Sequence, residues 1–185
     1  MKLCIADPPY LGRAHRYYGV GGGAAGYGRQ RADEHAEASK WDQPETHVAL
    51  VRQLNQDYDA WAIAMSVHSI GVYAATVPLD SRSGYRFAAW VKPDGSVPSG
   101  SRIQTSWEPV LFYVPKERRK WHSGPKVNDH LAANAGGQDF MGAKPSAWTR
   151  WVLDVLGYDP EQDTVHDLFP GSGAVTREIA QGVLL

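Results

Sequence analysis

The sequence predicts a layered α/β protein built on one sheet. Short apolar runs alternate along the chain with segments of helical periodicity, and this alternation is typical of strands joined by helices that cover a sheet. The chain has 185 residues, of which 43% are hydrophobic and 21% charged, a globular composition long enough to bury its own core. We find neither an internal repeat nor a linker, so residues 1–185 are predicted to form a single domain.

The first half of the chain is predicted to hold two strands separated by a long loop and a helix. The first apolar run is short and ends at once in Asp7-Pro8-Pro9, because proline cannot continue a central strand. The loop is rich in Gly, Arg, Ala and His and lacks periodicity, so it is interpreted as a lid-like segment. The expected order is strand, lid-like loop, helix, strand and short helix, at residues 3–6, 11–43, 44–56, 60–67 and 69–77.

The second half is predicted to add three strands and two helices. A glycine and serine loop separates the first two of these strands, and a second irregular stretch, whose first part is basic, precedes the next helix. The expected elements are strands at 87–91, 109–114 and 164–169, helices at 148–156 and 174–181, and loops at 94–101 and 115–143.

Composition and charge exclude several classes of protein. The net charge is −1, so affinity for a polyanion would need a local basic patch. The only cysteine, Cys4, cannot form an internal disulfide, which favours a reducing cytoplasm. No apolar run approaches the roughly 20 residues of a membrane span, and the N-terminus lacks a secretory signal. The seven histidines lack metal-binding spacing, so we expect no metal.

The segment Asp7-Pro8-Pro9-Tyr10 is the most informative motif, because it directly follows a predicted buried strand. An exocyclic amine of a nucleobase is a poor nucleophile, since its lone pair is delocalised into the ring. The Asp7 carboxylate and the Pro8 carbonyl can each accept one of its N–H groups, and the prolines stiffen that backbone. Tyr10 offers a ring on which a base can stack. The alternative interpretation is an ordinary turn after a strand.

The second motif is Asp167-Leu168-Phe169-Pro170-Gly171-Ser172-Gly173, a strand end and glycine turn before a helix. Glycines allow backbone N–H groups to approach a ligand, and a helix N-terminus favours a carboxylate or phosphate. A tight connection without a ligand explains this motif equally well when it is taken alone.

Together the two motifs resemble those of the amino-methyltransferases that use S-adenosylmethionine to methylate exocyclic nitrogens of nucleic-acid bases. Residues 7–10 resemble their catalytic motif, and residues 169–173 resemble their cofactor motif. Lys144-Pro145 resembles the segment that precedes the cofactor motif, and residues 107–113 resemble the strand before the recognition segment. The catalytic motif comes first in the chain, as in the permuted β-class of this family.

The resemblance implies a doubly wound, Rossmann-like, mostly parallel sheet of the class I methyltransferase type, with S-adenosylmethionine as cofactor. It assigns catalytic roles to Asp7, Pro8, Pro9 and Tyr10. It assigns cofactor contacts to Asp7, Lys144, Pro145, Asp167, Phe169, Gly171, Ser172 and Gly173. In this family further strands follow the helix after the cofactor motif. This sequence ends at Leu185, so we expect up to two edge strands to be missing. The ribose is then held by other residues, or the adenosyl site is open, or a second copy or another partner completes it.

Two basic segments are candidates for nucleic-acid contacts. The lid-like loop carries Arg13, His15, Arg16, Arg29 and Arg31, and the loop at 115–143 carries Arg118, Arg119, Lys120 and Trp121. These side chains could reach phosphates, with Trp121 stacking or wedging between bases. The alternative is that both segments are simply solvated. The loop at 115–143 is too short for an independent recognition domain, which is typical of a solitary, phage-like enzyme.

The sequence and the resemblance therefore predict methyl transfer to N6 of an adenine flipped out of double-stranded DNA. Three alternatives remain open: N4 of cytosine in DNA, N6 of adenosine in RNA, and a catalytically weak nucleic-acid-binding relic of the family.

Overall fold

The computed structural model describes residues 1–20, 34–93, 102–120, 124–135, 143–171 and 173–182. In chain order the elements are β1 (Lys2–Ala6), α1 (Ala14–Tyr18), the 3₁₀ turn η1 (Ala38–Asp42), α2 (Pro44–Asp57), β2 (Ala60–Ala64), η2 (Val67–Ser69), α3 (Ile70–Ala74), β3 (Tyr85–Val91), β4 (Trp107–Tyr113), η3 (Lys116–Arg118), β5 (His130–Ala132), α4 (Ser146–Leu156), β6 (Thr164–Asp167) and α5 (Ala174–Gly182).

The strands form one mixed sheet in the order β5-β3-β4-β2-β1-β6. β1 is parallel to both of its neighbours, and β3 is parallel to β5. β4 runs antiparallel to β2 and β3. The mostly parallel α/β sheet predicted from the sequence is thus confirmed. Over the described residues β6 is an edge strand, on the side where the expected further strands would pair.

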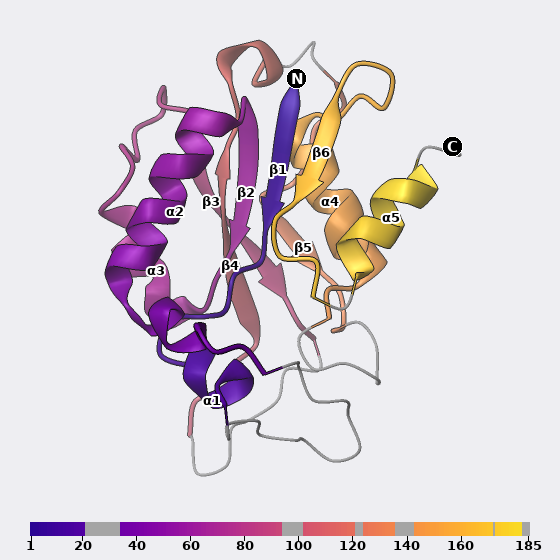
Figure 1. The fold of residues 1–185 in the computed structure, drawn as a ribbon. Helices are drawn as coiled ribbons and strands as arrows, with labels where there is room; N and C mark the ends of the chain where they lie inside the picture. The colour runs from indigo at the N-terminus through magenta and orange to yellow at the C-terminus, as the bar shows by residue number, and fades with distance from the viewer. Residues whose placement is uncertain (21–33, 94–101, 121–123, 136–142, 172, 183–185) are drawn as a thin grey trace.

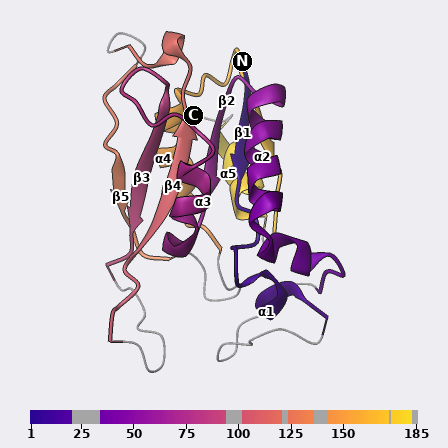
Figure 2. The same ribbon diagram turned by 90° about the vertical axis from the view of Figure 1, so that its left-hand side faces the viewer.

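Helices cover both faces of the sheet, which gives three layers (Figures 1 and 2). On one face α2 and α3 bury Leu54 and Tyr73 against Cys4, Trp61 and other sheet residues. On the other face α4 and α5 pack against the sheet through a second cluster of buried side chains, Trp148, Val152, Leu156 and Val175. Each large apolar side chain buried in this way contributes roughly 1.5–3 kcal/mol to folding.

The two longest helices show how local sequence sets these layers. α2 starts with Pro44, whose fixed φ and missing N–H suit a first helical turn. Its buried residues His47, Leu50, Val51 and Leu54 repeat at helical spacing along one face. α4 ends at Gly157, which takes a left-handed conformation with φ 68° that favours glycine at this position.

The strand expected at 164–169 ends early, at Asp167, and the structure differs from the predicted elements more clearly at three other places. The strand expected at 60–67 ends at Ala64, and η2 and α3 follow. The loop expected at 115–143 contains β5, which is only three residues long and pairs with β3, with His130 opposite Ala89. The lid-like segment 11–43 contains α1 and η1. No helix among the described residues is long and apolar enough to cross a membrane.

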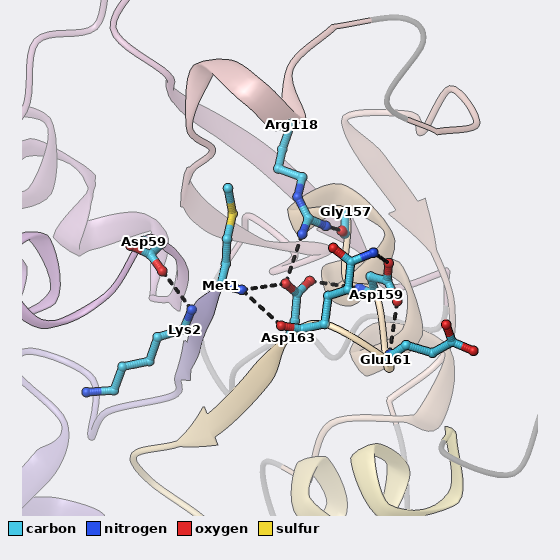
Figure 3. Close-up of polar contacts among 9 residues, drawn as sticks. Met1, Lys2, Asp59, Arg118, Gly157, Asp159, Glu161 and Asp163 are labelled. Atoms are coloured by element: carbon cyan, nitrogen blue, oxygen red, sulfur yellow. Dashed lines mark hydrogen bonds and ion pairs between the residues drawn. The ribbon is translucent and has the colours of Figure 1, made fainter.

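A buried carboxylate ties the start of β1 to the loop before β6 (Figure 3). Asp163 accepts hydrogen bonds from the N-terminal ammonium of Met1 (2.7 Å), the Arg118 guanidinium (2.8 Å) and the Asp159 amide (2.8 Å). Burial alone would raise the pKa of Asp163, but these donors outweigh it and hold the pKa below its usual value. This cluster fixes the end of the sheet at which β1 begins.

Candidate active site

The carboxyl ends of β1 and β6 meet at the point where the chain direction over the sheet reverses. β1 leads to helices on one face, whereas β6 leads to α5 on the other (Figure 1). Ile5 lies opposite Asp167, and the Leu168 amide donates to the Ile5 carbonyl at 3.1 Å. The segment after Ala6 and the glycine turn after Asp167 are therefore neighbours. Ligands of open α/β sheets bind outside the carboxyl ends of the strands at a switch point of this kind, and we use the word crevice below for this position beyond the ends of β1 and β6.

Lys144 brings residues distant in sequence to this crevice. Its ammonium lies 3.0 Å from Asp7 Oδ2, 2.9 Å from the Tyr10 hydroxyl and 3.4 Å from Glu108 Oε2. The Lys144 side chain is only 5% exposed, and the rings of Tyr10, Trp90 and Trp148 surround its ammonium at 5.3–5.6 Å. The motif resemblance implied a cofactor contact for Lys144; its ion pair with Asp7 is a structural finding.

Glu108, at the start of β4, is the second carboxylate of this group. The Tyr10 hydroxyl donates to Glu108 Oε2 at 2.7 Å, and Lys92 forms an ion pair with Oε1. Glu108 and Lys92 are 16% and 18% exposed. We refer to Asp7, Tyr10, Lys92, Glu108 and Lys144 as the Lys144 cluster; its two ammonium groups balance its two carboxylates.

Burial and charge pull the pKa values of this cluster in different directions. Burial raises the pKa of Asp7 above its usual value, with Glu108 adding to the rise and Lys144 opposing it. Burial would also raise the pKa of Glu108, but Lys144 and Lys92 more than offset it, and the pKa is lowered. For Lys144, burial alone would lower the pKa, whereas Asp7 and Glu108 raise it. Lys144 is therefore the fixed positive charge, and Asp7 is the carboxylate that protonates first as the pH falls.

This arrangement leaves Asp7 able to accept further hydrogen bonds. Lys144 binds one carboxylate oxygen, and a carboxylate offers two oxygens with about four lone-pair directions. Burial, followed by the charges of Glu108 and Asp7, raises the pKa of Tyr10 well above its usual value, so its hydroxyl is a neutral donor. The pair Asp7 and Tyr10 thus presents a negative charge next to a partly buried aromatic ring.

The glycine turn after β6 is held by Asp167. Its carboxylate accepts from the Phe169 amide (3.3 Å) and from the Thr176 hydroxyl (2.9 Å) at the start of α5. Gly171 and Gly173 have backbone φ angles of 44° and 71°. Residues with a side chain rarely adopt such angles. Asp167 therefore has a clear role in shaping the turn. Ser172 lies outside the described residues.

An aromatic group that sequence analysis missed supports this turn from the α2 side. The ring of Phe169 meets that of Trp41 edge-on at 5.0 Å. Buried His47 donates through Nε2 to the Trp41 carbonyl at 2.8 Å, so its Nδ1 accepts from the Tyr73 hydroxyl at 2.7 Å. Burial lowers the pKa of His47 and keeps it neutral, which suits this arrangement. The signal in the sequence was the placement of His47 on the apolar face of α2.

One of the two basic segments lies close to the crevice. The Asp42 carboxylate accepts from the amides of Ala14 and His15, both at 2.9 Å, and so ties α1 to η1. Figure 1 shows α1 below the carboxyl end of β1. Arg13 precedes α1 and Arg16 is exposed on it. Burial, followed by the charge of Asp7, raises the pKa of Tyr18, which ends this helix. Arg29 and Arg31 lie outside the described residues.

The other basic segment lies at the opposite end of the sheet. Arg118 binds Asp163 and the Gly157 carbonyl, beside Met1 (Figure 3), and Arg119 donates to the Arg82 carbonyl. The five residues of β1, about 17 Å of strand, separate this end from Asp7. Trp121 lies outside the described residues. The structure therefore does not bring Arg118, Arg119 and Lys120 together with the catalytic motif, and it gives Arg118 a role in stability.

Comparison with known proteins agrees with this architecture. No protein-family model and no curated protein matches the chain. Solved structures do match, among them M1.HpyAVI (16% identity, TM-score 0.57, 99% of this chain and 76% of that chain). The chain has a methyltransferase-like fold. The M1.HpyAVI-SAM complex matches at 16% identity and TM-score 0.58, over 97% of this chain and 76% of that one. The cytosine-N4-specific PvuII DNA methyltransferase matches at 13% identity and TM-score 0.57, over 98% of this chain and 71% of that one.

Proposed function

We infer that this protein transfers a methyl group from S-adenosylmethionine to an exocyclic amine of a DNA base, with N6 of adenine as the substrate. The observation that carries this inference is the position of Asp7: a carboxylate held by Lys144 in the crevice between β1 and β6, beside the glycine turn. Structural similarity to a cytosine-N4-specific DNA methyltransferase and to a SAM complex supports the same chemistry.

The residues around the crevice fit S-adenosylmethionine. When bound, this cofactor supplies a methyl group on a positively charged sulfur. The Asp7 carboxylate favours that charge, and the glycine turn at 171–173 allows the backbone to approach a ligand closely. Phe169 is held against Trp41 next to the turn, and Lys144 with Pro145 borders the crevice on the α4 side. Asp167 acts through the turn that it shapes.

The role of residues 7–10 is to hold the amine in a reactive geometry. Asp7 and the Pro8 carbonyl accept its two N–H groups, which frees the nitrogen lone pair to attack the methyl carbon as the carbon–sulfur bond breaks. The amine is too weak an acid to lose a proton beforehand, so Asp7 or water takes the proton after the new bond has formed. The main contribution of the chain is orientation and electrostatics.

The target base must leave the DNA stack to reach this crevice. The Tyr10 ring stacks on the flipped base, and its hydroxyl bonds to Glu108 and Lys144 fix the ring plane. Arg13 and Arg16, next to the crevice, contact phosphates of the same duplex. Arg119 and Lys120 follow η3 at the other end of the sheet, so we do not assign them to these phosphates.

Transfer of tritiated methyl groups to unmethylated genomic DNA, followed by nucleoside analysis, tests this function. N6-methyladenine is the expected product, and N4-methylcytosine would favour the cytosine alternative, which similarity to the PvuII enzyme also supports. Competition between duplex DNA and RNA separates the two nucleic acids. If the cofactor binds but no methyl is transferred to either, the inference is wrong and the chain is a binding relic.

A further inference from the structure

Glu108 and Lys92 lie beside the proposed reacting groups, yet the chemistry above gives them no task. Both come from the antiparallel half of the sheet, at the end of β3 and the start of β4, where Trp90 lies opposite Glu108. A charged pair so little exposed pays a desolvation penalty and needs a reason to persist.

Glu108 contacts three of the other four members of the cluster directly and is linked to the fourth, Asp7, through Lys144. Its Oε1 binds Lys92, and its Oε2 accepts from the Tyr10 hydroxyl and lies 3.4 Å from Lys144. The indole of Trp90 lies under both ammonium groups, 4.5 Å from Lys92 and 5.5 Å from Lys144. Lys92 thus anchors one oxygen of Glu108, and the other oxygen contacts Tyr10 and Lys144, which lie next to Asp7.

Two consequences follow for the groups that would meet the base. The Tyr10 hydroxyl has Glu108 as its acceptor, so the ring plane depends on this carboxylate. Lys144 is shared between Glu108 and Asp7, at 3.4 Å and 3.0 Å. Without Glu108, the whole charge of Lys144 would fall on Asp7 and compete with an incoming amine for its oxygens.

We propose that Glu108, anchored by Lys92, is a positioning residue that orients the Tyr10 ring and draws Lys144 partly away from Asp7. This proposal deepens the proposed function and rests on it for its meaning in catalysis. The rival explanation is a purely structural ion pair, which would support the fold without affecting Asp7.

The titration of Asp7 separates the two explanations. The ionisable groups that interact with Asp7 come from several neighbouring elements: Tyr10 after β1, Tyr18 from α1, Tyr73 from α3, Glu108 from β4 and Lys144 before α4. Lys92, directly after β3, acts on Glu108. The neighbouring tyrosines are neutral near pH 7. Removing the charge of Glu108 should therefore lower the pKa of Asp7, and removing the charge of Lys92 should raise it.

The experiment compares Glu108→Gln with a matched control, Glu178→Gln. Glu178 pairs with Arg150 between α5 and α4 at 2.8 Å and is 12% exposed, so it is an equally sheltered carboxylate outside the site. Relative to wild type, Glu108→Gln should lower kcat by about tenfold to a hundredfold with little change in the KM for cofactor, and shift the acid limb of the kcat profile to lower pH. Glu178→Gln should change neither.

A second measurement keeps the proposal testable whether or not the wild-type protein transfers methyl groups. ¹³C-carboxyl NMR of aspartate-labelled protein, with the Asp7 signal assigned through Asp7→Asn, follows the Asp7 titration directly. A lower Asp7 pKa in Glu108→Gln and a higher one in Lys92→Met support the proposal, even if the proposed function fails. An Asp7 titration unchanged in both variants overturns it. If Glu108→Gln does not fold, the sign of the shift in Lys92→Met decides.

Discussion

Replacement of Lys144 by methionine tests the electrostatic account of the site in the most detail. Methionine keeps an unbranched apolar side chain among Tyr10, Trp90 and Trp148 but removes the charge. Glu108 would keep its ion pair with Lys92, whereas Asp7 would lose the ammonium that binds it. Removing one partner of a buried ion pair costs about 3–5 kcal/mol. For a chain of this length that corresponds to a fall in Tm of about 6–20 °C.

The loss should depend on pH in a defined direction. Burial and Glu108 both raise the pKa of Asp7, and Lys144 opposes them, so the variant should have a still higher Asp7 pKa. An ionised Asp7 then destabilises the folded state of the variant more than that of the wild type, whereas a protonated Asp7 does not. The free energy of unfolding relative to wild type should therefore be lowest at alkaline pH and recover as the pH falls and Asp7 becomes protonated. Methyl transfer should be weak at neutral pH and recover in part as the pH rises.

Urea unfolding at pH 5, 7 and 9 measures this difference. Lys40→Met is the matched control, because Lys40 forms an exposed pair with Glu37, and such pairs contribute only about 0–1 kcal/mol. If Lys144→Met is no less stable than Lys40→Met, or if its loss of stability is the same at all three pH values, the charge balance described for the cluster is wrong.

Four further predictions concern the site and its supports. Asp7→Asn should abolish methyl transfer and lower Tm, measured by calorimetry, by less than Lys144→Met does, because Lys144 keeps Glu108 as a partner and the raised pKa of Asp7 means that its own charge is costly in the fold. A fall in Tm as large as that of Lys144→Met would favour a structural turn. Tyr10→Phe should lower kcat/KM by about tenfold, because the hydrogen bonds of the hydroxyl to Glu108 and Lys144 are lost. Tyr10→Ala should lower kcat/KM further, because stacking on the base is lost as well. Equal losses in the two variants would mean that the ring does not stack. Asp163→Asn should lower the free energy of unfolding in urea at pH 7, and this loss should shrink as the pH falls through the lowered pKa of Asp163, because the wild-type carboxylate is then protonated. A loss independent of pH would exclude its ion pairs as the cause. Arg16→Ala should reduce the slope of log K against log salt for DNA binding by about 0.9, and Lys120→Ala should leave it unchanged; the reverse result would move the DNA to the far end of the sheet.

The sequence was sufficient to predict the elements whose signal is local. The buried run before Asp7, the periodic face of α2 and the glycine that ends α4 are properties of short segments, and the structure has each of them. β5 escaped prediction because its three residues become a strand only through pairing with β3. Elements of that kind are set by contacts distant in sequence.

The site was predictable in its motifs but not in its charge network. Residues 7–10 and 167–173 stand out because proline and glycine at strand ends restrict the backbone. Glu108 opens an apolar strand, where a carboxylate is most simply interpreted as an exposed strand end, and nothing local indicates that Lys92 and Lys144 face it. The basic run at 116–120 gave a plausible local signal, but the antiparallel course of β4 carries it to the opposite end of the sheet.

The most direct test of the central claim, that Asp7 holds an exocyclic amine in the crevice between β1 and β6, is tritiated methyl transfer to unmethylated DNA by wild type and Asp7→Asn under identical conditions. The account predicts N6-methyladenine from the wild type and no labelled base from the variant, with both proteins folded. Equal labelling by the two proteins, or a folded wild type that labels no base, would contradict it.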